Sequence, residues 1–148
     1  MPRLAFNKRA KFDYEILESF EAGLALTGQE VKSVRAERMG LAGAFVTIHN
    51  GAAWLTNAHI PKYDKVGPLP DYDPDRSRKL LLHRREISRL IGKMEQKGLT
   101  LVPISVYTKG PTVKLEFGLA RGKRQYQKKE AIKRRDVDRE IRRSYSSK

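Results

Sequence analysis

The sequence predicts a mainly β protein with short helices, a compact antiparallel β-barrel, followed by a basic C-terminal tail. Three observations lead to this prediction: an Asn-Gly pair between two apolar runs, strict apolar alternation near residue 115, and a concentration of positive charge at the chain end. A length of 148 residues fits one domain with a modest hydrophobic core. We expect the β-barrel domain to span residues 1–121 and the tail to span residues 122–148.

The first part of the predicted barrel contains strands and one helix. Residues 12–26 mix aromatic and branched side chains with acidic ones, and Gly23 among them suggests two short strands joined at that glycine. Thr27 and Glu30 stand at the spacing of a capping box, which predicts a helix that begins there and ends at Gly40.

A hairpin and a long loop come next. The dipeptide Asn50-Gly51 suits a type I′ turn, so we expect strands at 44–49 and 52–59. Residues 61–78 are rich in Pro, Gly and Asp and predict a long surface loop, a kind of segment that often has a functional role.

A second helix is predicted from apolar spacing. Ile87, Leu90, Ile91 and Met94 lie at i, i+3, i+4 and i+7, which indicates a helix docked by one face, and Gly98 is its expected stop.

A second hairpin completes the predicted barrel, with strands over residues 99–107 and 112–120. Val113, Leu115, Phe117 and Leu119 alternate with other residues, which is typical of a half-buried sheet. Five or six short strands with two helices favour an antiparallel barrel of the oligonucleotide-binding type, and a mixed α+β sandwich is the alternative.

Charge is the strongest indication of a partner. The chain has a net charge of +14, and residues 121–148 hold twelve Lys or Arg against four Asp or Glu. Such a surface favours a polyanion such as nucleic acid. The tail has too few apolar residues to fold alone, so we expect it to be disordered when free and helical on RNA.

Several classes of function are not supported by the residues. The chain has no Cys, so it has neither disulfides nor thiolate zinc sites, and no apolar run has the length of a membrane span; we expect a soluble, cytoplasmic protein. The acids Asp71, Asp73 and Asp75 lack the Gly and Glu of a calcium loop, and we expect no metal or other cofactor.

An enzymatic role is not expected. None of the histidines has an acid at a recognised catalytic spacing, so a binding protein is favoured. A ribonuclease that uses His59 or His83 with a lysine is one alternative, and a structural ribosomal protein is another.

Four clusters of cations predict the RNA-binding surface, because phosphates attract Lys and Arg. They are Lys8, Arg9 and Lys11; Lys32, Arg35 and Arg38; Arg76, Arg78 and Lys79; and the tail, where Tyr126 is a candidate for base stacking. Glu30 lies among them, and it either serves the capping box or accepts hydrogen bonds from a base edge or a 2′-hydroxyl.

Several stretches together resemble one protein family. They are NKRAKFDYEILESFEAGLALTGQEVKSVR, NAHIPKY after the hairpin, DPDRSRKLLLHRREISRL, KGLTLVPISVY and GLARGKRQYQKKE, and they occur in this order over nearly the whole chain. This combination is similar to the small protein B (SmpB) family, the SsrA-binding proteins of bacteria.

The resemblance implies an RNA-binding translation factor for trans-translation. It would bind the tRNA-like domain of transfer-messenger RNA (SsrA RNA) and deliver it to stalled ribosomes, for ribosome rescue and tagging of incomplete proteins, in the place of a tRNA anticodon arm. The implied ribosomal contacts are small-subunit RNA, the decoding region and the mRNA channel. We expect a monomer with no membrane partner.

The resemblance also assigns roles to residues: it places Glu30, Lys32, Ser33 and Arg35 in the family's RNA-facing helix, and Gly122, Lys123, Tyr126, Lys128 and Glu130 in the tail motif. With the charge clusters added, the expected RNA-binding residues are Glu30, Lys32, Ser33, Arg35, Lys8, Arg9, Lys11, Arg76, Arg78 and Lys79. The expected ribosome-binding residues of the tail are Lys123, Arg124, Tyr126, Lys128, Lys129, Lys133 and Arg134. The chain departs from the usual family residues at Phe12, Gln29, Gln127 and Lys129.

Overall fold

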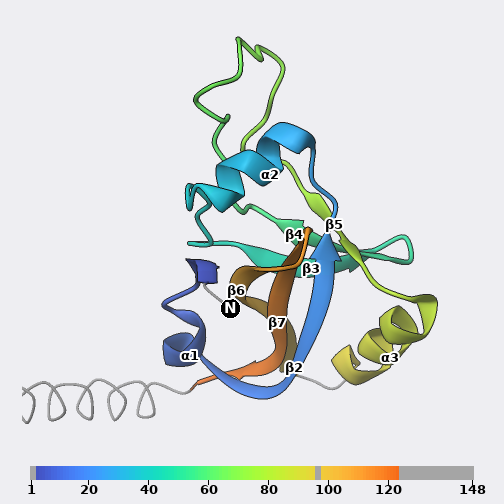
Figure 1. The fold of residues 1–148 in the computed structure, drawn as a ribbon. Helices are drawn as coiled ribbons and strands as arrows, with labels where there is room; N and C mark the ends of the chain where they lie inside the picture. Colours follow the sequence, from blue (N-terminus) through green and yellow to red (C-terminus); the bar gives the residue numbers. More distant parts are fainter. Residues whose placement is uncertain (1–2, 96–97, 124–148) are drawn as a thin grey trace, which may run out of the picture.

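A computed structural model describes residues 3–95 and 98–123, in which seven strands and three helices bury one large hydrophobic cluster and one small one (Figure 1). The elements along the chain are β1 (Arg3–Phe6), α1 (Ala10–Asp13), β2 (Tyr14–Leu24), α2 (Gly28–Arg35), β3 (Phe45–His49), β4 (Ala52–Thr56), β5 (Arg78–Leu81), α3 (Arg84–Met94), β6 (Leu99–Lys109) and β7 (Thr112–Gly122). Of the predicted tail, residues 124–148 lie outside the described residues.

The strands form a single sheet in the order β1-β6-β7-β2-β5-β4-β3, and all neighbours are antiparallel. The sheet curves on itself, so that β3 at one edge lies against β6 near the other edge. The predicted antiparallel barrel with short helices is confirmed, and the α+β sandwich is not. In the part of the chain that the structure describes, no helix is long and apolar enough to cross a membrane.

The core lies inside this curved sheet. Val113, Leu115, Phe117 and Leu119 are all buried, as their alternation predicts. Phe117 has no exposed surface, and its ring stacks on that of Phe20 with the centroids 5.6 Å apart. Alternation therefore identifies the inward face of β7 correctly.

The first hairpin follows its local sequence. Asn50 and Gly51 have φ angles of 51° and 72°, as a type I′ turn requires. The second strand ends at Thr56, three residues earlier than predicted, because Asn57 adopts a φ of 62° and turns the chain away. His59 then pairs with Gly40 in an isolated bridge.

The prediction of two short strands in residues 12–26 is wrong. Residues Tyr14–Leu24 form one continuous strand, β2, which pairs with β7 over most of its length and with β5 at its end, whereas Phe12 and Asp13 belong to α1. Gly23 does not break the strand, because it pairs with both neighbouring strands, with Lys114 of β7 and with Leu81 of β5. The Leu81 side chain also approaches it closely. A bulge between Ile16 and Glu18 supplies the irregularity instead.

Helix α1 was not predicted, and the two predicted helices, α2 and α3, each need one correction. Helix α2 has the expected capping box but ends at Arg35 rather than Gly40, because Glu37 has a φ of 60° that no α-helix accepts. In α3, Ile87 and Leu90 are buried as expected, whereas Ile91 is 42% exposed because the helix contacts the sheet with a narrower face.

Among the described glycines, Gly118 leaves the least room for a side chain and gives a first prediction. A Cβ atom at this position would lie 2.8 Å from Cγ2 of Ile16 and 3.2 Å from Cδ1 of Ile104. We expect Gly118→Ala to lower the free energy of unfolding by about 1–3 kcal/mol, measured by chemical denaturation, because the added methyl group overpacks the core. The control is Gly92→Ala in α3, where a Cβ has open space and alanine should raise stability by up to about 1 kcal/mol. Unchanged stability of Gly118→Ala would contradict this packing.

Candidate nucleic-acid interface

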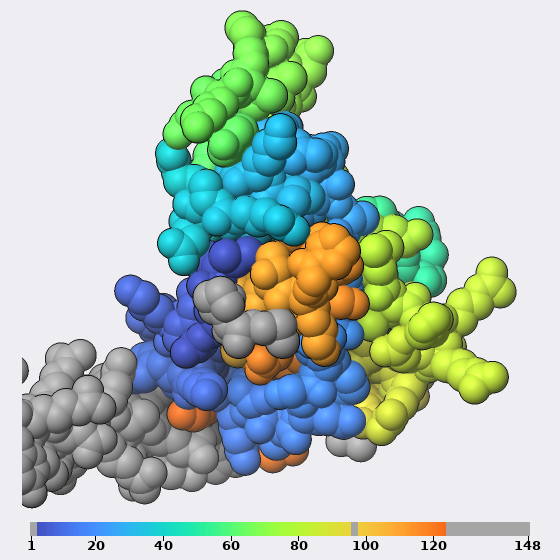
Figure 2. Space-filling view, viewed as in Figure 1, coloured from blue at the N-terminus to red at the C-terminus, as the bar shows by residue number. Residues whose placement is uncertain are grey.

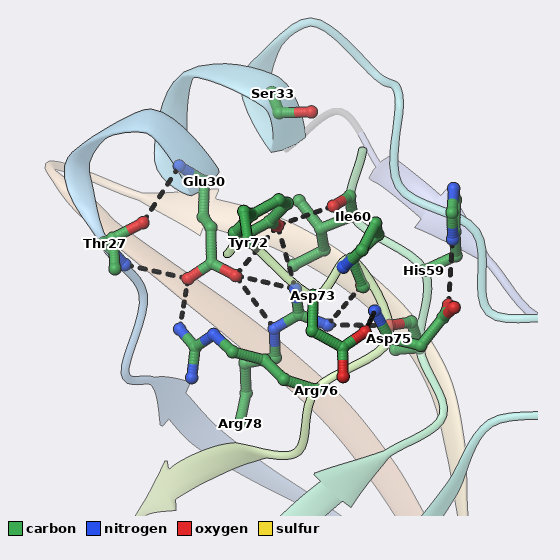
Figure 3. A network of polar contacts seen from close by, with 12 residues as sticks. Thr27, Glu30, Ser33, His59, Ile60, Tyr72, Asp73, Asp75, Arg76 and Arg78 are labelled. Carbon is green, nitrogen blue, oxygen red and sulfur yellow. Dashed lines mark hydrogen bonds and ion pairs between the residues drawn. The ribbon is translucent and has the colours of Figure 1, made fainter. Parts of the chain in front are cut away.

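The N-terminus of α2 is built around the carboxylate of Glu30. The hydroxyl of Thr27 accepts a hydrogen bond from the Glu30 N–H at 3.4 Å, and Glu30 Oε1 accepts one from the Thr27 N–H at 3.0 Å. These two bonds are the predicted capping box. The same carboxylate also binds Arg76 and Arg78, which lie in and just after the long loop (Figure 3).

Arg78 is buried completely, and each of its five N–H groups has an acceptor. Its Nε and Nη2 atoms donate to Glu30 Oε2 at 3.0 and 2.6 Å, and Nη2 also donates to the Tyr72 hydroxyl at 3.1 Å. Its Nη1 atom donates to the carbonyl oxygens of Ala58 and Pro74 at 2.7 and 2.9 Å. No donor of this guanidinium is left for RNA.

Electrostatics keep the Glu30 carboxyl ionised. Burial alone raises its pKa, but the hydrogen bonds from Thr27, Arg76 and Arg78 outweigh this effect and lower the pKa from 4.5 to about 2. Burial and the adjacent carboxylate raise the pKa of Tyr72, whose hydroxyl donates to the Ile60 carbonyl oxygen at 2.6 Å. The network is therefore an ion pair surrounded by satisfied polar groups.

The long loop, residues 61–77, is held to α2 at both of its ends and projects from the barrel (Figure 1). At its start, Ser33 Oγ donates to the Pro61 carbonyl oxygen at 2.7 Å, and Arg38 pairs with Asp64 at 2.8 Å. At its end, Arg76 pairs with Glu30. Helix α2 thus positions the loop as well as presenting its own cations.

The structure corrects part of the predicted RNA-binding surface. The side chains of Glu30, Ser33 and Arg78 are buried, because they join α2 to the long loop and to β5. Their side chains present no surface to RNA in this conformation. By contrast, Lys32 and Arg35 are exposed, as α2 packs on the body through Val34 and keeps these cations outside.

The other predicted cations outside the tail lie on the surface or near it. Lys8, Arg9, Lys11 and Lys79 are exposed and Arg76 is half-buried. Arg9 pairs with Asp13 at 3.1 Å and lies over the Phe12 ring at 5.0 Å. Lys123 lies beside α1, where its N–H donates to the Asp13 carbonyl oxygen at 2.8 Å. The remaining tail residues lie outside the described residues.

A cleft of about 760 Å³ lies beside the first cation cluster. Its lining includes Phe6, Leu41 and Phe45, with Lys8 and Arg9 among the charged residues. Apolar and aromatic surface next to cations is the combination that single-stranded RNA recognises. The cleft therefore makes this side of the barrel chemically suited to binding single-stranded RNA.

The comparison with protein families decides the assignment. A family model described as SmpB protein matches residues 4–147. The chain belongs to the SmpB family.

Relatives in the SmpB family are similar over nearly their whole length. The SsrA-binding protein of Gloeothece citriformis is 53% identical over 138 residues, which cover 93% of this chain and 89% of that protein. The SsrA-binding protein of Thermosynechococcus vestitus is 50% identical over 141 residues, which cover 95% and 93%.

A solved structure agrees with this family assignment. It is described as "tmRNA-SmpB: a journey to the center of the bacterial ribosome". The match has a TM-score of 0.66 and 50% sequence identity, and it covers 86% of this chain and 92% of that chain.

Reasoning from sequence missed two features of this SmpB-family chain. Nδ1 of His59 lies 2.8 Å from Oδ1 of Asp75, an acid 16 residues away that no catalytic spacing indicates, and both side chains are exposed. The second feature is Tyr72, whose hydroxyl bonds with both Glu30 and Arg78 and which no pattern of nearby residues indicates. The sequence shows the Pro and Asp turns around His59 and Tyr72, but it does not show the hydrogen-bond partners of these two side chains.

Proposed function

We propose that this chain is a non-enzymatic RNA-binding translation factor of trans-translation. It binds the tRNA-like domain of transfer-messenger RNA and brings that RNA to stalled ribosomes, where it stands in for a tRNA anticodon arm. The observation that carries this proposal is the match to the SmpB family over residues 4–147, together with the likeness to a solved tmRNA-SmpB structure.

The described surface supports a binding role. Lys32 and Arg35 are exposed on α2, next to a loop whose two ends are tied to the same helix. Cations held on a rigid element attract phosphates without a large loss of conformational entropy. We assign the tRNA-like domain to this side, which comprises α1, α2 and the long loop, and we assign the tail to the ribosome.

The exposed histidines do not favour the ribonuclease alternative. In the described part of the chain, neither His59 nor His83 is hydrogen-bonded to a lysine, and His83 lies apart at the N-cap of α3. The His59–Asp75 pair instead joins the end of the long loop to the turn after β4.

Removing the two exposed cations of α2 tests the assigned surface. We expect Lys32→Ala combined with Arg35→Ala to weaken binding of the tRNA-like domain by about 10-fold at physiological salt, and to lower the slope of log affinity against log salt by about 2. The reason is the loss of two phosphate contacts. Binding is measured by titration with excess ordinary tRNA as competitor.

The matched control is Arg84→Ala combined with Arg85→Ala, which removes the same charge from α3 on another side of the barrel. It should leave the affinity for the tRNA-like domain unchanged. If the two double variants lose equal affinity, net charge rather than the α2 surface governs binding. If wild-type protein shows no preference for the tRNA-like domain over tRNA, the proposed function itself is wrong.

A further inference from the structure

The cleft beside α1 exposes apolar surface that the described chain leaves uncovered. Phe6 and Phe45 both line it, and they are 40% and 46% exposed, although a large exposed apolar surface is unusual on a soluble domain. Figure 2 shows the blue surface of the N-terminal segment directly below a cyan surface, and residues from 6–14, 40–45 and 100–102 line the cleft. A volume of about 760 Å³ is enough for several apolar side chains.

The charges around this cleft favour an acidic occupant. Its lining contains the cations Lys8 and Arg9 and one acid, Asp13. Arg9 forms an ion pair with Asp13, whereas among the described residues no acid pairs with Lys8. The cleft thus combines apolar surface with a positive charge that has no acidic partner in the part of the chain that the structure describes.

The tail begins at the rim of this cleft (Figure 1). Gly122 pairs with Tyr14, which lines the cleft, and the Lys123 N–H donates to the carbonyl oxygen of Asp13 at 2.8 Å. Nζ of Lys123 also donates to the Lys11 carbonyl oxygen at 2.6 Å, which fixes the end of the described chain beside α1. The rest of the tail is therefore tethered next to the cleft.

One segment of the tail has the composition that the cleft favours. Residues 136–141, DVDREI, hold three acids against one arginine, although the tail as a whole is strongly basic. Val137 and Ile141 are four residues apart, and so are Asp136 and Glu140, a spacing that places each pair on one side of a helical turn. The segment can therefore present an apolar pair beside an acidic pair.

The length of the tether permits this segment to reach the cleft. Asp136 follows Lys123 by 13 positions, which span about 20 Å as a helix and up to about 43 Å when extended. A flexible tether of this length holds the segment at an effective concentration of about 1 mM. A segment that binds with an intrinsic dissociation constant of about 0.1 mM then occupies the cleft for about nine tenths of the time. Weak contacts are therefore sufficient.

We propose that residues 136–141 dock in the cleft beside α1 in the free protein and that RNA displaces them. This inference rests on the proposed function, which assigns this side of the barrel to the tRNA-like domain. Val137 and Ile141 cover the apolar lining, and the acids of the segment neutralise Lys8. The docked segment competes with RNA for the cleft, so weakly binding RNA is excluded, and the tail is released for the ribosome once the tRNA-like domain is bound.

A nitroxide spin label tests the docking directly, because the chain has no Cys and Ser144→Cys gives a single labelling site. In the labelled full-length chain without RNA, we expect the amide NMR signals of Leu41 and Phe45 in the cleft to lose most of their intensity. The signal of Gly92 in α3, on another side of the barrel, should keep its intensity. Loss of none of these signals, or of all of them equally, would contradict docking in the cleft.

The affinity for RNA provides a second readout. Val137→Ser combined with Ile141→Ser removes the apolar pair without changing the net charge. It should restore the cleft signals in the labelled chain and strengthen binding of the tRNA-like domain by about 10-fold, because the fraction of molecules with an open cleft rises from about a tenth to nearly all. The matched control, Ile132→Ser, removes an aliphatic residue of the tail outside the segment and should change neither readout.

Two further results would overturn the inference. An unchanged RNA affinity of the double serine variant would show that the segment does not compete with RNA. Signals of Leu41 and Phe45 that stay weak after the tRNA-like domain is added would show that RNA does not displace the segment. Failure of the proposed function appears separately, as a wild-type chain that does not prefer the tRNA-like domain to ordinary tRNA, whereas the signal loss without RNA still reports docking.

Discussion

Glu30→Gln is expected to lower the free energy of unfolding by about 3–5 kcal/mol, because it removes the anion that compensates a buried guanidinium. Arg78 is fully buried and donates twice to this carboxylate. A neutral amide cannot offset the charge of Arg78, and Arg76 loses its ion-pair partner in the same step. Chemical denaturation of both proteins measures the difference.

The control for this prediction is Asp64→Asn. Asp64 also pairs with an arginine, Arg38, but both side chains are more than half exposed. An exposed pair contributes only about 0–1 kcal/mol, so stability should hardly change. The contrary outcome is informative: if Glu30→Gln keeps its melting temperature and loses RNA affinity, the carboxylate contacts RNA directly and the network does not have the structural role described above.

Acid should destabilise the wild-type chain more than the Glu30→Gln variant. The pKa of Glu30 is lowered from 4.5 to about 2 in the folded chain, so the unfolded state binds a proton before the folded state does. The stability from this group is therefore complete above about pH 4.5 and is lost as the pH falls through about 2, by roughly 3 kcal/mol in total.

Denaturation curves of both proteins from neutral pH down to about pH 2 measure this effect. Glu18 and Glu21 also have a lowered pKa, through Lys93 and through Tyr107 and Lys109, but both proteins contain these groups and their contribution cancels. The stability difference between wild type and Glu30→Gln should narrow as the solution becomes acidic. A constant difference would mean that Glu30 is protonated at its ordinary pKa.

The two predictions have a functional consequence because the same network holds the long loop. Glu30 lies on α2, which also presents Lys32 and Arg35, and its partners Tyr72 and Arg76 belong to the loop. Breaking the ion pair therefore disturbs the relative position of α2 and the loop. A loss of RNA affinity in a Glu30 variant therefore has to be compared with the loss of stability of the same variant.

The sequence was sufficient wherever a few neighbouring residues decide the backbone. Asn50-Gly51 allows the positive φ angles of its turn, Thr27 and Glu30 form the capping box between themselves, and alternation places Phe117 in the core. Family membership is equally a property of the sequence, since the resemblance rests on motifs spread over the chain. Each of these signals is local, or is a sum of local signals.

Tertiary structure alone decided which cations remain exposed. Arg78 and Arg35 look alike in sequence, yet one is fully buried on an acid 48 residues away while the other is exposed. Tertiary structure also decided that β2 continues through Gly23, because β7 pairs with β2 up to this residue and β5 pairs with it from this residue on. Pairing across such separations depends on how the sheet curves, so a pattern of nearby residues predicts that this chain is basic, but not which arginines can reach RNA.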